Sequence, residues 1–271
     1  MPRPPRRSNR LAAKPKRNYR AMAGLRPVPA KKATTALIKR VLNSHLETKY
    51  VATQVQLAGF TIPGQITPTL DYHLMLPDVA QAGASTSITR IGDKIEPVRA
   101  RIAGHIWFDN LGSDDADPGA VVFVKLFFVT PKNIKSASQV GGISNGLLES
   151  GTADPSSWTA ARQDLQAFFP VCKENYTLHK TKTFKLVKNG GLPIANTRPA
   201  STNIGKDRYS FSYAWKPPVL KYDTDADLQP TNHLPLMFCV AYSPGYNYST
   251  DASLVGQVKM NWNIELGFKD A

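Results

Sequence analysis

The last part of the sequence alternates strictly between apolar and polar residues. The apolar positions are Val258, Met260, Trp262, Ile264, Leu266 and Phe268, and the residues between them are mostly charged or amide side chains. Successive side chains of a strand point to opposite faces of a sheet, so this period of two predicts a strand with one buried face. A chain that ends on such a strand needs a second layer to cover that face.

Strands of the same kind are predicted throughout residues 41–271. They lie at residues 49–57, 98–109, 176–188, 208–216 and 236–242. In the second of these, the expected buried face holds Val98, Ala100, Ile102, Ile106 and Phe108. Residues 120–130 are apolar on both faces, which predicts a strand covered on both sides, in the middle of a sheet or at a subunit contact.

One helix is predicted between the strands. Asp154 is suited to cap it and Pro155 to occupy its first position, and Pro170 ends it. Its apolar residues follow at spacings of three and four, namely Trp158, Ala161, Leu165 and Phe168.

The predicted fold class is all-β. Seven or eight strands, no alternation of strands with helices and long irregular connections indicate two antiparallel sheets packed face to face. We expect a single eight-stranded antiparallel jelly roll with one inserted helix, and a Greek-key sandwich is the alternative. Connections of roughly 15 to 40 residues favour the jelly roll over a simple meander.

The first 40 residues differ in composition from the rest of the chain. They hold thirteen Lys or Arg and no acid, whereas the other 231 residues carry 21 basic and 20 acidic residues. Repeated prolines, like-charge repulsion and little apolar surface predict a disordered basic arm over residues 1–40, joined to a jelly-roll domain over residues 41–271.

Nucleic acid is the expected partner of this arm, because basic terminal blocks bind polyanions. A membrane surface is the alternative, disfavoured because no amphipathic apolar face precedes Leu37. No base-reading motif is present, so binding should be independent of sequence. The predicted phosphate-binding residues are Arg3, Arg6, Arg7, Arg10, Lys14, Lys16, Arg17, Arg20, Arg26, Lys31 and Lys32.

The arm also holds two basic clusters separated by a short spacer. Arg6 and Arg7 form the first cluster, and Lys14, Lys16 and Arg17 form the second. This spacing is typical of a nuclear localisation signal that an import receptor reads, although basic tails also contain such clusters by chance.

A second basic site is predicted on the domain itself. Arg99, Arg101 and Trp107 share one face of a predicted strand and would form a stacking patch on an inner surface. The alternative is a solvated edge or a subunit contact. The lysines at positions 180, 182, 185 and 188 are expected to shield strand faces without binding a ligand.

Enzymatic and metal-binding motifs are missing from the sequence. Cys172 and Cys239 lie far apart, the five histidines are scattered, and no phosphate-binding loop is present. We therefore expect a protein that is not an enzyme, with no cofactor, no metal and no membrane partner. Two groups of acidic residues are candidates for calcium sites, but solvated turns are the favoured interpretation of both. The groups are Asp114, Asp115 and Asp117, and Asp223, Asp225 and Asp227.

The order of segments resembles a known family. A basic arm is followed by LIKRVLNSHLETKYV, IGDKIEPVRARIAGHIWFD, VVFVKLFFVTPKNIKS and FFPVCKENYTLHKTKTFKL, and the chain closes on an apolar strand. This is similar to the capsid proteins of small eukaryotic viruses with circular single-stranded DNA genomes. Capsid proteins of some small RNA viruses share the layout, and a ribosomal or chromatin protein is a further alternative.

The resemblance implies a structural function. It implies a jelly-roll shell domain, self-assembly into a small icosahedral particle, a T=1 shell of about 60 copies, and a basic arm that faces the packaged DNA genome. It also implies location in the virion and, during assembly, in the host nucleus.

Overall fold

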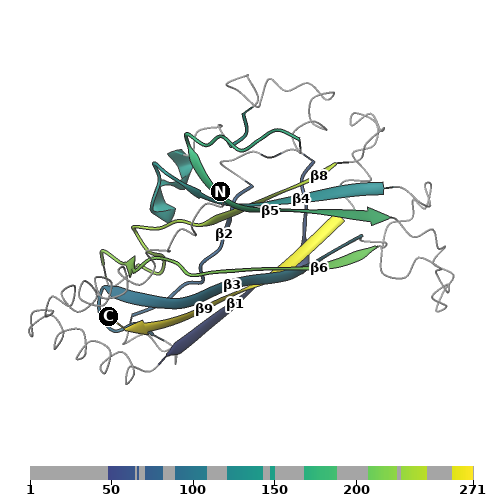
Figure 1. Ribbon diagram of the computed structural model, residues 1–271. Helices are drawn as coiled ribbons and strands as arrows, with labels where there is room; N and C mark the ends of the chain where they lie inside the picture. Colours follow the sequence, from purple (N-terminus) through teal and green to yellow (C-terminus); the bar gives the residue numbers. More distant parts are fainter. Residues whose placement is uncertain are drawn as a thin grey trace, which may run out of the picture. The chain divides into compact units, whose positions relative to one another are not determined.

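The computed structural model describes residues 48–64, 66, 71–81, 89–108, 121–142, 147–149, 168–187, 207–224, 227–242 and 258–270. The regular secondary structure of the described residues is almost entirely strand, arranged in two antiparallel sheets (Figure 1). Sheet A consists of β1 (Lys49–Thr61), β9 (Val258–Asp270), β3 (Lys94–Phe108) and β6 (Arg208–Trp215) in that order, with β7 (Leu220–Lys221) beside β3. Sheet B consists of β2 (His73–Leu74), β8 (Leu236–Tyr242), β4 (Val121–Pro131) and β5 (Tyr176–Val187).

The strand pairs are nested along the chain. β4 pairs with β5, β3 with β6, β2 with β8, and β1 with β9. Two additional antiparallel pairings, β3 with β9 and β4 with β8, join these pairs side by side into the sheets. The chain therefore forms one long antiparallel ribbon whose successive sections lie in alternate sheets.

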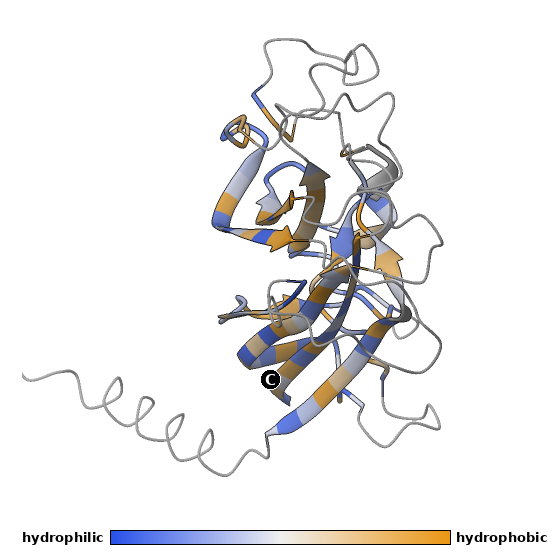
Figure 2. Cartoon of the chain, turned by 90° about the vertical axis from the view of Figure 1, so that its right-hand side faces the viewer, coloured by the Kyte–Doolittle hydropathy of each residue, from blue (hydrophilic) through white to orange (hydrophobic). Residues whose placement is uncertain are grey.

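The main core lies between the sheets. All six apolar positions predicted for β9 are buried, from Val258 to Phe268, and the strands of Figure 2 alternate between hydrophilic and hydrophobic residues accordingly. Phe211 of β6 is buried in the same cluster, and Tyr209, Tyr213 and Trp215 pack against it. The face that the period of two predicted for these strands is thus confirmed.

A second apolar cluster covers the other side of sheet B. Leu126 of β4 belongs to the core between the sheets, whereas its neighbour Phe127 belongs to the second cluster. All seven residues of β8 are buried for the same reason. The prediction that residues 120–130 form a doubly covered strand in the middle of a sheet is confirmed.

The structure also differs from the sequence prediction in detail. β3 begins at Lys94 rather than Val98, and its pairing with β9 shifts by one residue between Pro97 and Arg99. Val98 lies at this bulge and is 44% exposed, so its predicted burial is wrong. Proline lacks the N–H that a regular ladder requires, which is consistent with its position at the irregularity.

Three short elements were not predicted. β2 and β7 contain two residues each, too few for a visible alternation, and β7 raises the strand count of the described residues from eight to nine. A 3-10 helix, η1 (Ala137–Gly142), follows β4. The predicted helix that begins at Asp154 lies outside the described residues, except for its last residues from Phe168 onward.

Candidate nucleic-acid interface

The predicted arm lies outside the described residues. The chain divides into two units, Met1–Glu47 and Thr48–Ala271, and the structure describes residues only of the second. The positions of the predicted phosphate-binding residues, from Arg3 to Lys32, and of the predicted boundary after residue 40 therefore stay predictions. The arm is covalently joined to sheet A, because β1 begins at Lys49.

The second predicted basic site lies on the outer face of sheet A. Arg99, Arg101 and Trp107 all belong to β3 and point away from the core, since Ala100, Ile102 and Ile106 between them are fully buried. At about 3.3 Å per residue, Arg99 and Trp107 lie roughly 26 Å apart, so the three side chains do not converge. They mark the two ends of one face rather than a compact patch.

Arg101 forms an ion pair across the sheet. Its guanidinium nitrogen lies 3.5 Å from a carboxylate oxygen of Glu265, and both side chains are 42% exposed. Asn263 donates a hydrogen bond to the other oxygen of this carboxylate at 3.1 Å. Glu265 is thereby held on the sheet and its charge is offset by Arg101.

A hollow of about 520 Å³ lies between the two ends of this face. Its centre is lined by polar side chains from all four long strands of sheet A: Gln54, His105, Ser210, Ser212, Asn261 and Asn263. The pairing places them in adjacent rows, with Asn263 beside Ala103 and Asn261 beside His105. Sequence reasoning identified the polar side of β9, but not the order of strands that brings these residues together.

Hydrogen bonds shape the floor and rim of the hollow. His105 and Ser210 share a hydrogen bond of 3.0 Å between Nδ1 and Oγ. Lys182 reaches over from β5 and donates a 2.6 Å hydrogen bond to the carbonyl oxygen of Ser212. Burial, together with the nearby Lys180, lowers the pKa of the Lys182 ammonium group. Because Lys182 bonds to the backbone of the edge strand β6, its ammonium group lies at the edge of the hollow.

The outer face of sheet B has a different character. It is covered by the second apolar cluster, in which Phe127, Val129, Phe238 and Val240 pack against Tyr176 and residues from the connecting loops. Phe123 also stacks on Tyr242, with ring centroids 5.4 Å apart. No such cover lies over the polar face of sheet A among the described residues.

The acidic loop that begins at Asp223 uses its carboxylates internally. Asp227 accepts hydrogen bonds from the backbone N–H groups of Thr224 at 2.8 Å and Asp223 at 3.1 Å, and these bonds lower the pKa of its carboxyl group. Asp223 in turn accepts a hydrogen bond of 2.9 Å from Thr231. Two of the three aspartates of this loop thus accept hydrogen bonds from groups within the same turn region, and the choice between a solvated turn and a calcium site stays a prediction.

A buried arginine, which sequence reasoning missed, holds the same loop. Arg90 is fully buried and donates to the carbonyl oxygens of Gly92 at 2.6 Å and Thr224 at 2.9 Å, while its guanidinium lies 4.2 Å from the ring centre of Tyr222. In the described part of the chain no three His, Cys, Asp or Glu residues form a metal-binding group. Asp225 and the group from Asp114 to Asp117 lie outside that part.

The described histidines do not form one site. His73 packs between Phe60 and Trp262 in the sandwich, with ring centroids 4.5 and 4.7 Å away. Burial lowers the pKa of His73 to about 4, and burial together with His179 lowers the pKa of His233 to about 4. Both imidazoles are therefore neutral at pH 7, while His105 lies on the face of sheet A.

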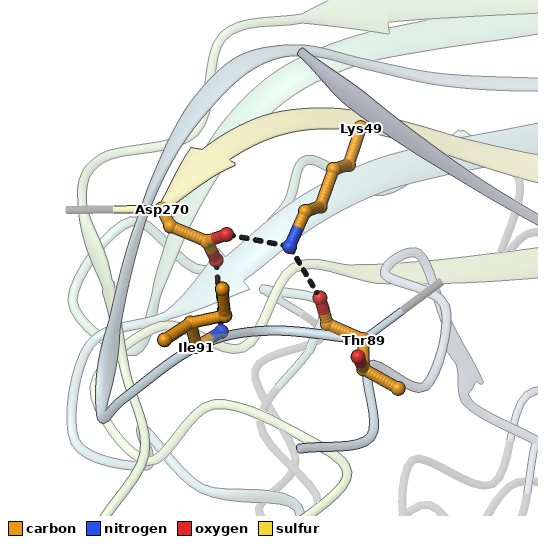
Figure 3. A network of polar contacts seen from close by, with 4 residues as sticks. All are labelled: Lys49, Thr89, Ile91 and Asp270. Carbon is orange, nitrogen blue, oxygen red and sulfur yellow. Dashed lines mark hydrogen bonds and ion pairs between the residues drawn. The ribbon is translucent and has the colours of Figure 1, made fainter. Parts of the chain in front are cut away.

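A polar network fixes the start of β1, the strand that the arm leads into. The Lys49 ammonium lies 2.6 Å from Asp270 and donates to the carbonyl oxygen of Thr89 at 2.9 Å, and the backbone N–H of Ile91 donates to Asp270 at 2.9 Å (Figure 3). These contacts join the first and last described strands to the segment before β3.

The lysines of β5 have varied positions. Lys182 binds the backbone of β6 as described, and Lys180 and Lys185 are exposed, whereas residue 188 lies outside the described residues. Cys172 and Cys239 are both free thiols, in agreement with the absence of a predicted disulfide.

Comparison with known proteins gives no relative. No model of a protein family matches the chain, and a search of curated proteins finds no match. Among the described helical residues, none form a helix with the length and apolar character needed to span a bilayer.

Proposed function

We propose that this chain is a structural capsid protein, a single jelly roll that assembles with copies of itself into a small icosahedral shell and packages a single-stranded DNA genome. The observation that carries the proposal is the nested strand pairing. With β7 set aside, sheet A contains the first, eighth, third and sixth strands, and sheet B contains the second, seventh, fourth and fifth. An eight-stranded antiparallel ribbon wrapped in this order corresponds to the two Greek keys of a jelly roll.

The two unlike faces of the sandwich support a role in a shell. A shell subunit has one side toward the genome, and the outer face of sheet A is polar, cationic at both ends and hollowed. The arm with its thirteen basic residues precedes β1 of this sheet in the sequence. Neutralisation of phosphates by Lys and Arg is the main source of affinity in sequence-independent binding of nucleic acid.

The nearly neutral charge of residues 41–271 favours packaging over a cellular role. Residues 41–271 carry 21 basic and 20 acidic residues, whereas a ribosomal or chromatin protein surrounded by nucleic acid is expected to be basic on its globular part as well. The resemblance in segment order favours a DNA genome, with location in the virion and passage through the nucleus by way of the arm's basic clusters.

Assembly is tested on the purified full-length protein. We expect size-exclusion chromatography and negative-stain microscopy to reveal closed particles of megadalton mass, containing about 60 copies for a T=1 shell. A protein that remains a monomer both with and without nucleic acid would contradict the proposal.

Packaging is tested by deleting residues 1–32. We expect the truncated chain to retain a cooperatively folded β domain and to lose its nuclease-protected nucleic acid. Digestion of the wild-type contents with DNase or RNase separates a DNA genome from an RNA genome. Wild-type amounts of protected nucleic acid in the deletion variant would show that the arm does not package.

A further inference from the structure

The hollow on the outer face of sheet A has the dimensions of a short stretch of nucleic acid. Its lining on β3 runs from Arg101 to His105, and Trp107 lies two residues further along the same face. The stretch from Arg101 to Trp107 covers six residues or roughly 20 Å, and the hollow crosses four strands that are spaced by about 4.8 Å. Its floor is low because Ala103, Ser210 and Ser212 are small. Two or three nucleotides of an extended single strand fit within such a span.

The floor offers hydrogen-bonding groups at the level where bases would lie. Side-chain amides of Gln54, Asn261 and Asn263 line it, beside the hydroxyl groups of the two serines. Within the described part of the chain, the buried Oδ1 atom of Asn263 has no hydrogen-bond partner. Amides and hydroxyls both donate and accept, so such a floor suits the edges of any base.

The rim supplies charge and one aromatic ring. At one end, the paired residues Trp107, Lys259 and Arg208 form a single row across β9, β3 and β6. Trp107 is anchored against the backbone, since a Cβ on Gly59 would come within 3.0 Å of its ring. At the other end Arg101 lies beside Glu265, and Lys182 lies at the β6 edge. Among the described residues of the hollow and its rim, four cationic side chains and the carboxylate of Glu265 give an excess of positive charge, which favours a polyanion.

A protein partner fits this surface less well. The centres of protein interfaces are enriched in large apolar and aromatic side chains and depleted in charge. On sheet A the exposed apolar side chains Tyr50 and Val98 lie near the opposite end, beyond Arg101. The apolar residues that line the hollow, Val55, Phe211 and Trp262, belong to or pack against the core between the sheets, and Phe211 and Trp262 are buried there.

We propose that this hollow is a second nucleic-acid site, which binds two or three nucleotides of a single strand without regard to sequence. Phosphates contact Arg101, Arg208 and Lys259, the floor amides contact base edges, and Trp107 provides a stacking surface. The sequence predicted a patch of Arg99, Arg101 and Trp107. The proposed site keeps Arg101 and Trp107, adds the residues of the hollow between them, and does not include Arg99. The inference rests on the packaging function proposed above.

The test is photocrosslinking of the full-length protein to a short oligothymidylate, followed by mass spectrometry of the linked peptides. We expect links to the arm and also to the β3 segment that holds His105 and Trp107. In Ser212→Glu, a carboxylate enters the hollow from the exposed edge strand β6, and the β3 links should fall about 5-fold. Thr181→Glu is the matched control, with the same charge change on the exposed edge strand β5 of sheet B, and should leave the links unchanged.

Each outcome has a separate meaning. Links confined to the arm, or β3 links that respond equally to both variants, overturn the second site and leave the packaging function standing. Absence of any binding by the full chain overturns the packaging function itself. Ser212→Ala, which removes one hydroxyl of the floor but adds no charge, should lower the β3 links less than Ser212→Glu does, and thermal unfolding of each variant verifies that it is folded.

Discussion

The outer faces of the two sheets differ although both sheets belong to one sandwich. The outer face of sheet B lies under a second apolar cluster that includes Phe127 and Phe238, so both sides of β4 and β8 are buried. The outer face of sheet A holds amides, hydroxyls and charges around a hollow. Sheet B is therefore the layer between two apolar clusters, whereas no such cluster covers the outer face of sheet A in the described part of the chain.

Truncation of a side chain should give the largest difference in unfolding free energy between the two outer faces. Phe238→Ala removes a fully buried ring from the outer face of sheet B and should lower the free energy of unfolding by about 3–5 kcal/mol. Gln54→Ala on the exposed outer face of sheet A should change it by less than about 0.5 kcal/mol. Urea unfolding measures both, and equal losses would mean that the two faces are alike.

Adding one methyl group tests the two sides of sheet A. A Cβ on Gly104 points into the core and would lie 2.1 Å from the backbone oxygen of Asn261, so Gly104→Ala should destabilise by about 3 kcal/mol. A Cβ on Gly267 points outward and meets mainly the ring of Tyr50, which is 67% exposed. Because that ring has room to move, Gly267→Ala should cost under about 1 kcal/mol. Thermal denaturation ranks the two, and a larger loss for Gly267→Ala would reverse the assignment.

Acid should lower the stability of the protein through two partly buried histidines, His73 of sheet B and His233. Burial lowers the pKa of His73 and His233 from 6.5 to about 4, so the unfolded chain takes up these protons at higher pH than the folded chain does. The contribution to stability is complete above pH 6.5 and is lost as the pH falls toward 4. Allowing for partial exposure, we expect a loss of roughly 2 kcal/mol for each histidine.

The variant His73→Gln isolates one of these two contributions. Its stability should fall about half as much as that of the wild type between neutral pH and the acid end of the range, as measured by urea unfolding at each pH. An equal fall in both proteins would exclude His73 as a source of the acid sensitivity.

Two ion pairs on sheet A give the smallest expected effects. Lys49 and Asp270 are 24% and 19% exposed and share additional hydrogen bonds, so Lys49→Met should cost about 1–2 kcal/mol. Arg101 and Glu265 are more exposed and 3.5 Å apart, and Arg101→Gln should cost at most about 0.5 kcal/mol while weakening nucleic-acid binding. A large loss of stability in Arg101→Gln would indicate a structural role for that residue in place of a binding role.

The local pattern of the sequence was sufficient to predict where the long strands lie and which of their faces are buried. Period two along a strand is a property of the backbone, so the buried side of β9 and the double cover of β4 follow from residue order alone. The segregation of charge into residues 1–40 is likewise visible in composition. The bulge that exposes Val98 was not predicted, because it depends on how β3 pairs with β9.

Only the tertiary structure decided which strands are neighbours. Asn261, His105 and Ser210 belong to three strands far apart in the chain, and the order β9, β3, β6 places them in one row of the hollow. Arg90 and the contact of Lys49 with Asp270 depend in the same way on segments brought together by folding. Strand order is set by the packing of whole layers, a non-local free energy that the alternation within one segment does not contain.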